Sequence, residues 1–325
     1  MPGRTLTTAA AALAMVLALT ACNLVEINLG PKAQPLVERT VSGQGRAKVL
    51  LIDVSGVMFV GAARNPLSPF GPAADMVSRL AEELDAARRD PDVKALLVRI
   101  DSPGGTVAAA DLVHHELERY KKEARVPVVA AMMGVCASGG YYAAMAADRV
   151  TALPSTVTGS IGVISVKLDL SGIMDKVGVR TETVKTAVYK DMWSPFRPAT
   201  EEERRLMQGL IDDFFRRFKE VVRQGRPRMT PSQLAEATTA KVFTASQALA
   251  LGLIDQIAYP DEAVGIAKKM AGLTEARVVV YHRPGGYRPT IYSQADPALA
   301  PPSLTDLLPL AAAPQLMYLW LPGAR

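Results

Sequence analysis

The chain has 325 residues and a formal net charge of +5, and 49% of its residues are hydrophobic. This length and apolar content are sufficient for one large or two medium domains with a real core, and they exclude a disordered chain. Basic and acidic residues are interspersed, and no stacking aromatic residues lie among the basic ones, which argues against nucleic-acid binding.

The N-terminus has the pattern of an export signal. Arg4 precedes an uncharged apolar stretch at residues 9–21, which is too short for a comfortable membrane span. The stretch ends in Leu-Thr-Ala-Cys, which resembles the lipobox of bacterial lipoproteins, where the cysteine is acylated and becomes the mature N-terminus. We therefore expect a leader at residues 1–22, a lipid on Cys22 and a membrane-anchored protein on the extracytoplasmic side, periplasmic or outer. An uncleaved anchor helix is the alternative.

The cysteines and histidines give no sign of a disulfide or a metal site. Cys136 is the second of two cysteines, so acylation of Cys22 leaves no partner for an intrachain disulfide. The three histidines, His114, His115 and His282, form no cluster with cysteines. We expect neither a metal nor a cofactor.

Strand-like and helix-like segments then alternate along the chain. Residues 23–45 carry Gly, Pro, Gln and Ser with little periodicity and are interpreted as a tether. The segments that follow are strands at 48–59, 93–100, 126–133, 149–153 and 161–166, and helices at 73–89, 107–122, 141–147, 170–177, 201–224 and 261–271. This alternation predicts an α/β fold with a mainly parallel sheet and flanking helices, whose functional groups lie at the carboxyl ends of the strands.

Two glycine-rich turns follow neighbouring strands. Ser138 lies between a strand-like run and an alanine-rich helical run, with glycines around it, as a nucleophilic serine requires. A simple helix N-cap is the alternative. Residues 101–105, Asp-Ser-Pro-Gly-Gly, form the second turn. If the two strands are adjacent and parallel, the amides of Gly105 and Gly139 flank one carbonyl oxygen and form an oxyanion hole.

A nucleophilic serine also needs a base. His114 and His115 share one helix with Asp111 that leads away from the turn, so a Ser-His-Asp triad fits poorly. A neutral lysine is the other common solution. Lys190 stands out because it lies in a loop with aromatic neighbours just before a long helix. The alternative is a surface lysine paired with Asp191.

Four segments in order resemble one known family. They are residues 101–105, 137–142, 158–163 and 189–195. Together they resemble the signal peptide peptidase A family of serine–lysine peptidases, in its short bacterial form. The resemblance covers residues 46–273 and implies a Clp/crotonase-like fold with a repeated β-β-α architecture.

The resemblance also implies roles for individual residues. Ser138 matches the nucleophile, Lys190 the general base, Gly105 and Gly139 the oxyanion positions, and Ser160 a supporting residue. It further implies a homo-oligomeric ring in which the serine and lysine of one site come from neighbouring chains, and substrates that are remnant signal peptides or other short apolar peptides.

The chain departs from the family at two points. Ala240 and Ala245 stand where the family usually has glycines. The family is also commonly anchored by a transmembrane helix, whereas we expect a lipid anchor here. Residues 274–325 form a Pro/Ala-rich tail with apolar patches, which is either disordered or docked on a neighbouring subunit. Two other functions stay open: an acyl-CoA-type hydratase or hydrolase of the same fold, and a catalytically inactive lipoprotein scaffold.

Overall fold

The computed structural model describes residues 35–61, 76–283 and 316–320. The expected leader, Cys22 and most of the expected tether lie outside the described residues. Within the described ranges, no helix is long and apolar enough to cross a membrane.

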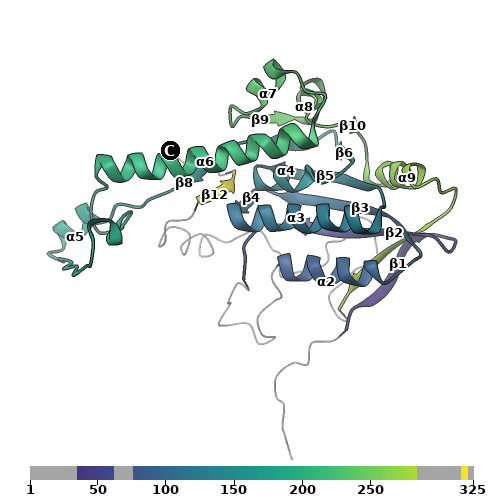
Figure 1. Cartoon of the computed structure of the whole chain (residues 1–325), viewed down its shortest axis with the longest axis horizontal. Coiled ribbons are helices and arrows are strands. Elements are labelled where there is room, and N and C mark those ends of the chain that lie inside the picture. Colours follow the sequence, from purple (N-terminus) through teal and green to yellow (C-terminus); the bar gives the residue numbers. More distant parts are fainter. Residues whose placement is uncertain (1–34, 62–75, 284–315, 321–325) are drawn as a thin grey trace, which may run out of the picture. The chain divides into compact units, whose positions relative to one another are not determined.

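The fold centres on a largely parallel sheet with strand order β1-β11-β2-β3-β5-β6-β10, and β7 and β9 extend it beside β5 (Figure 1). Its strands are β1 (Val37–Gly43), β2 (Lys48–Ser55), β3 (Val93–Ser102), β5 (Val128–Ala137), β6 (Arg149–Ala152), β7 (Val157–Gly159), β9 (Val242–Thr244), β10 (Gln256–Ile257) and β11 (Arg277–His282). Only the β1–β11 and β7–β9 pairs of this sheet are antiparallel. The predicted α/β class is therefore confirmed.

Helices cover both faces of this sheet, while α5 lies apart from it (Figure 1). The α-helices of the described residues are α2 (Met76–Arg88), α3 (Val107–Ala124), α4 (Gly139–Ala144), α5 (Ser171–Lys176), α6 (Glu201–Gly225), α7 (Pro231–Ala237), α8 (Ala245–Ala250) and α9 (Pro260–Met270). Alternate residues of β2 serve the two faces: Leu50 and Ile52 pack in the core with α2 and α3, and Val49 and Leu51 pack with α9. A strand buried on both faces reads as a continuous apolar run, which is why its sequence was readily recognised.

A short second sheet lies beside the carboxyl ends of β3 and β5. The chain leaves β3, forms β4 (Gly104–Thr106) and enters α3, which makes one β-β-α unit. Thr106 caps α3 by accepting a hydrogen bond from the Ala109 amide at 3.3 Å. The second sheet has the order β4-β12-β8, with β8 at Ile164–Ser165 and β12 at Leu316–Leu319. Its middle strand comes from the far end of the chain.

Two strands lie where the sequence indicated only a tether or a tail: β1 falls within residues 23–45, and β12 falls within residues 274–325. β11 also falls within residues 274–325, but there the sequence pattern at residues 278–281 already indicated a strand. Every residue of β1 is exposed or half-buried, so the strand has no apolar periodicity to mark it. β12 has only four residues, and its pairing with β4 and β8 depends on segments distant in the sequence.

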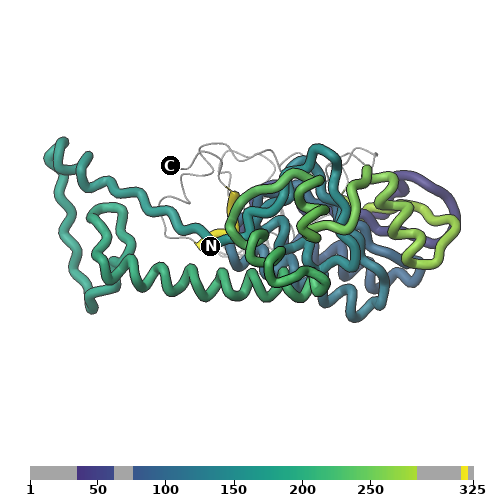
Figure 2. The backbone as a smooth tube through the Cα atoms, turned by 90° about the horizontal axis from the view of Figure 1, so that it is seen from above, coloured from purple at the N-terminus to yellow at the C-terminus, as the bar shows by residue number. Residues whose placement is uncertain are grey.

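Residues 166–200 extend beyond the N-terminal end of α6 and carry α5 and the 3₁₀ helix η1 (Val188–Asp191) (Figures 1 and 2). Arg197 holds this segment against α6, because its guanidinium forms ion pairs with Asp191 of η1 and with Glu203 of α6. Large apolar side chains stay exposed on it, including Ile173 at 63% and Val184 at 93%. Exposed apolar surface of this kind is typical of an interaction face.

Candidate active site

Ser138 occupies a strained turn between β5 and α4. Its φ of 52° and ψ of −115° lie outside the regions that residues with a Cβ normally adopt. The Ser138 amide donates to the Gly159 carbonyl at 2.8 Å, and its carbonyl accepts from the Tyr142 amide at 2.9 Å. The hydroxyl makes no capping hydrogen bond to α4. The N-cap interpretation therefore fails, and the side chain is left available for another role.

The turn at residues 101–105 is held rigidly against the Ser138 turn. The Ser102 hydroxyl donates to the Gly56 carbonyl at 2.6 Å and accepts from the Gly104 amide at 3.1 Å. The Asp101 carboxylate accepts from the Val135 amide of β5 at 3.0 Å. These bonds fix the end of β3 beside the end of β5, as expected for adjacent parallel strands.

The two glycine amides predicted for an oxyanion hole lie at this junction. A Cβ on Gly104 would lie 2.7 Å from the Gly139 nitrogen, so the two turns are in close contact. Met58 bonds the Gly104 carbonyl and the Thr106 amide, both at 2.9 Å. Because peptide groups alternate sides along a strand, the Gly105 N–H faces away from Met58. The Gly139 N–H belongs to the first turn of α4 and has no partner within the helix.

Ser160 lies next to the same turn. β7 pairs with β5 so that Gly159 is opposite Ala137, and Ser160 follows directly. Ser160 is buried, has a φ of 49°, and its amide donates to the Lys241 carbonyl at 2.7 Å. The structure thus brings Ser160 to the vicinity of Ser138, and its supporting role stays a prediction.

Lys190 lies in η1, away from this junction. Its side chain is exposed and makes no ion pair with the part of the chain that the structure describes. Asp191 pairs instead with Lys185 and Arg197, so the alternative of a Lys190–Asp191 surface pair is not observed.

The length of α6 separates η1 from the aromatic residues behind α4. Arg197, which holds η1, bonds Glu203 near the start of the helix. Phe218, near its other end, packs edge-on against Tyr142 of α4, with ring centroids 5.1 Å apart. At about 1.5 Å per residue, Glu203 and Phe218 are about 22 Å apart. Within the described chain, no hydrogen bond or ion pair links Lys190 to Ser138.

Other titratable groups near the turn have structural roles. His114 packs edge-on against Tyr142, with ring centroids 5.3 Å apart, and burial lowers the pKa of its imidazole to about 4. Burial raises the pKa of the Cys136 thiol well above its ordinary value. His114 is therefore a neutral packing residue, and Cys136 is not a thiolate nucleophile.

Sequence reasoning missed Tyr318. This residue of β12 is fully buried against Tyr142 and Phe218, and its hydroxyl donates to the Phe214 carbonyl at 2.8 Å. The sequence indicates an apolar patch at residues 316–321, and a neighbouring subunit is one surface on which this patch was expected to dock. In the structure it docks on its own chain.

An α/β fold with a serine at a strained strand-to-helix turn, flanked by glycine amides, defines the setting of a serine peptidase. Residues 120–274 match the family model described as Peptidase family S49. The chain is 32% identical over 247 residues to the Enterococcus faecium protein named signal peptide peptidase SppA, covering 76% of this chain and 70% of that protein. The chain therefore belongs to Peptidase family S49 and is a serine peptidase.

Two further comparisons are more partial. The chloroplastic serine protease SPPA of Arabidopsis thaliana is 32% identical over 253 residues, which cover 77% of this chain and 36% of that protein. A solved structure of the 1510-N membrane-bound stomatin-specific protease aligns at 16% identity with a TM-score of 0.42, covering 66% of this chain and 77% of that one. Of the two enzyme functions left open by the sequence, a peptidase and an acyl-CoA-type enzyme, the family match supports the peptidase.

Proposed function

We propose that this serine peptidase works through a Ser/Lys dyad, with Ser138 as the nucleophile and Lys190 as the general base. The observation that carries the proposal is the Ser138 turn: a strained backbone carries a hydroxyl that makes no capping bond, and Gly139 of this turn lies against Gly104 of the neighbouring glycine turn. Strain of about 1–3 kcal/mol persists only where the surrounding structure enforces it, and it concentrates at functional sites.

The chemistry follows from these groups. The Ser138 oxygen attacks the peptide carbonyl while the neutral lysine amine accepts its proton. The Gly105 and Gly139 amides stabilise the negative oxygen of the tetrahedral intermediate. The lysine then gives its proton to the leaving amine, and water hydrolyses the acyl-enzyme by the same route in reverse.

We propose that the two residues of one site come from different chains. A lysine serves as a base only where burial or nearby positive charge favours its neutral form. Lys190 is exposed in the single chain, so a neighbouring chain must supply that environment. The exposed apolar residues of the same segment, such as Ile173, Val184 and Val188, provide a surface on which chains can associate into a ring.

The proposed substrates are remnant signal peptides or other short apolar peptides at a membrane surface. Support comes from the apolar and aromatic surroundings of the site and from the name of the Enterococcus relative.

The proposed anchor is a lipid on Cys22, on the extracytoplasmic side. Cys22→Ser should release the protein from membranes or leave an unprocessed precursor. If the intact mass of the wild-type protein corresponds to a chain that starts at Met1 and carries no lipid, the lipid anchor is contradicted.

A fluorophosphonate probe tests the nucleophile directly. The probe should label the wild-type protein at Ser138, and Ser138→Ala should abolish both labelling and hydrolysis of an apolar peptide, a loss on the order of a thousandfold or more. Ser155→Ala, a change at an exposed serine, is the matched control and should behave as wild type. A wild-type protein that is folded yet never labelled favours the inactive scaffold instead.

A further inference from the structure

The chain just past β2 lies behind the turn that carries Gly105. The Met58 amide donates to the Gly104 carbonyl at 2.9 Å, and the Met58 carbonyl accepts from the Thr106 amide at 2.9 Å. Met58 and Gly105 form a parallel bridge, and a Cβ on Gly105 would overlap the Met58 backbone. The backbone of Met58 therefore packs directly against Gly105, and a glycine is needed for this approach.

These bonds set the direction of one proposed oxyanion donor. The Gly104 carbonyl and the Gly105 N–H belong to the same peptide group, and in a trans peptide they point in opposite directions. Since the carbonyl is bonded to the Met58 amide, the Gly105 N–H points away from Met58. Rotation of this peptide group would turn the N–H with it, so the direction of the donor depends on how well the turn is restrained.

Ser102 is the side chain that ties this turn to the chain behind it. Its hydroxyl donates to the Gly56 carbonyl at 2.6 Å and accepts from the Gly104 amide at 3.1 Å. The Gly56 amide donates in turn to the Asp101 carbonyl at 2.9 Å. Glycine adopts many backbone conformations, and Gly104 has a φ of 101°, so a fixed conformation there requires a restraint from a neighbouring group.

The surroundings of Ser102 leave its side chain one orientation. The residue is fully buried, and its Cβ would lie 3.4 Å from a Cβ on Gly140, in the first turn of α4. A hydroxyl has one hydrogen to donate and can accept at the same time, and both functions are used between Gly56 and Gly104. Ser102 thus lies between the chain after β2, the glycine turn and the helix that follows the nucleophile.

We propose that Ser102 is a positioning residue for peptide hydrolysis: its hydroxyl holds the Gly104 amide against the end of β2 and so keeps the Gly105 N–H directed at the carbonyl oxygen of the substrate. The proposal deepens the proposed function and rests on it, because the amides of Gly105 and Gly139 are the proposed oxyanion donors. Preorganised donors are effective because they need no reorganisation when negative charge develops. A loosened turn would have to be reordered in every transition state, so the loss falls on the chemical step.

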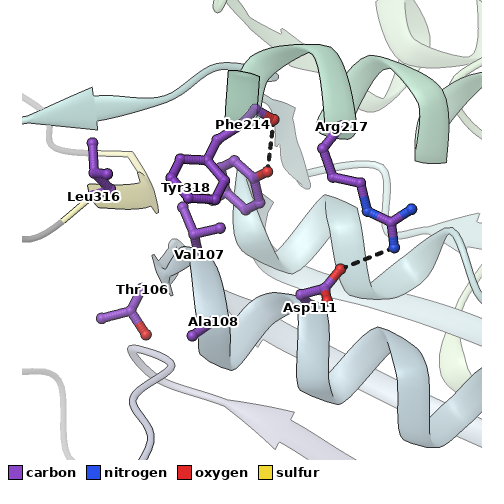
Figure 3. A pocket seen from close by; sticks show the side chains of 8 residues that line it. All are labelled: Thr106, Val107, Ala108, Asp111, Phe214, Arg217, Leu316 and Tyr318. Atoms are coloured by element: carbon purple, nitrogen blue, oxygen red, sulfur yellow. Dashed lines mark hydrogen bonds and ion pairs between the residues drawn. The ribbon is translucent and has the colours of Figure 1, made fainter. Parts of the chain in front are cut away.

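The apolar cavity beside the site is formed by other residues. Its volume is about 530 Å³, and it lies between the first turn of α3 and α6, as Figure 3 shows. Thr106, Phe214 and Arg217 are in its wall, and Ser102 does not line it. Loss of the Ser102 hydroxyl should therefore lower kcat with little change in KM.

Kinetics of three variants give the first test. Ser102→Ala removes both bonds, and Ser102→Cys places a weak donor and acceptor in the same space. The kcat for an apolar peptide should fall by about ten- to a hundredfold in Ser102→Ala, and by less in Ser102→Cys. Thr151→Val is the control and should keep the wild-type kcat, because it removes a buried hydroxyl that donates to the Ala130 carbonyl at 3.1 Å on β6. An unchanged kcat in Ser102→Ala overturns the proposal.

Two inhibitors of one peptide sequence separate positioning from general damage to the site. When a peptide aldehyde binds, the Ser138 oxygen bonds to the aldehyde carbon and the π electrons move to the carbonyl oxygen, while the serine proton passes to the base. The matching peptide alcohol binds without forming this bond. Ser102→Ala should bind the aldehyde at least about tenfold more weakly than wild type does, and the alcohol equally well. An equal loss for both inhibitors overturns the proposal.

The same inhibitors distinguish failure of this proposal from failure of the proposed function. If wild type prefers the aldehyde and both Ser102 variants keep the full preference, the Ser102 role is wrong and the role of Ser138 stands. If wild type shows no preference and no fluorophosphonate labelling, both proposals fail. Should Ser102→Ala not fold, Ser102→Cys decides, because its thiol fills the space of the hydroxyl: a wild-type kcat and a wild-type aldehyde preference in that variant overturn the proposal.

Discussion

Two requirements conflict at Ser138: the position of its hydroxyl and the conformation of its backbone. Its hydroxyl has to project from the tip of a tight turn, and its backbone takes a positive φ that a Cβ disfavours. The neighbouring bonds, from the Ser138 amide to Gly159 and from the Tyr142 amide to Ser138, hold it there. The strained backbone at Ser138 thus lowers the stability of the fold but holds the hydroxyl in the position proposed for catalysis.

A comparison of two inactive variants measures that strain. Ser138→Gly removes the Cβ that the turn disfavours, whereas Ser138→Ala keeps it. We expect Ser138→Gly to be more stable than Ser138→Ala by about 1 kcal/mol, despite the entropy that glycine usually costs in a folded chain. Urea denaturation of both variants gives the difference. An alanine variant that is equally or more stable would show that the turn is relaxed.

Glu83 is a second residue with an uncommon environment. It is buried in α2, its carboxylate is 3.0 Å from Arg79, and it lies near the buried Asp53–Arg99 pair. Burial raises the pKa of its carboxyl from the ordinary 4.5 to about 7, although Arg79 acts in the opposite direction. Between these values the folded state keeps a proton that the unfolded state releases.

The stability of the protein should therefore fall as pH rises through this range. The contribution of protonated Glu83 is fully present below pH 4.5 and is lost by about pH 7, a change of at most about 3 kcal/mol. Glu83→Gln cannot ionise, so its free energy of unfolding should decline less between pH 5 and 7.5. Glu82→Gln, at the exposed neighbouring position, should keep the wild-type decline. Parallel curves for all three proteins would rule out this role.

At the scale of elements, Arg197 decides where η1 lies. It bonds Asp191, next to Lys190, and Glu203 in the first turn of α6. The hydrogen bonds and the positive charge of Arg197 lower the pKa of both carboxyls. Arginine suits this position because its planar fork can bond two carboxylates at once, whereas lysine is a single point of charge.

Arg197→Lys should therefore loosen η1 and misplace Lys190. We expect kcat/KM for peptide hydrolysis to fall by about tenfold, since small displacements of a catalytic group are costly. Thermal unfolding should be almost unchanged, because the sheet core lies elsewhere. Arg204→Lys, at an exposed pair with Glu201, is the control and should keep full activity. Full activity of Arg197→Lys would mean that η1 is positioned by other contacts.

The sequence was informative where local pattern and tertiary role agree. The buried strands β2, β3 and β5 are apolar runs, and the turns after β3 and β5 carry glycines that their geometry requires. Ser138, Gly105 and Gly139 could therefore be placed together by reasoning about adjacent parallel strands.

Other features depend on contacts that no local pattern encodes. β12 is a four-residue strand between partners at residues 104–106 and 164–165, so its pairing could not be read from its own residues. β1 exposes most of its side chains and resembles a linker. The position of Lys190 relative to Ser138 depends on the direction in which the segment before α6 leaves the sheet. No local pattern predicts this direction, and the pairing of the two residues was expected only from the family resemblance.

At the scale of the whole molecule, a shared active site predicts complementation between inactive chains. Ser138→Ala and Lys190→Ala should each be inactive alone. Co-assembled, they should regain activity, because some sites pair an intact serine from one chain with an intact lysine from another. In an equal mixture the expected recovery is about a quarter of wild type, since a shared site draws its serine and its lysine independently and each is intact in about half of the chains.

The matching control replaces Lys190→Ala with a chain that carries both changes. Mixing Ser138→Ala with the doubly changed chain leaves every site without an intact serine, so it should stay inactive whatever the arrangement. Hydrolysis of an apolar peptide is the measurement, with co-assembly verified by affinity tags on each chain. Co-assembled single variants that show no activity would place both residues of a site in one chain.

The pairing of β1 with β11 bears on how this protein is made. β11 supplies both the neighbour of β1 and the outer neighbour of β2, and its residues, from Arg277 to His282, follow almost the whole catalytic region. Until that segment leaves the ribosome, one edge of the fully buried strand β2 has no partner. Contacts between such distant parts of a chain form slowly, and an unpaired apolar edge invites association with other chains. The large sheet can therefore close only after β11, its last strand in chain order, has been synthesised.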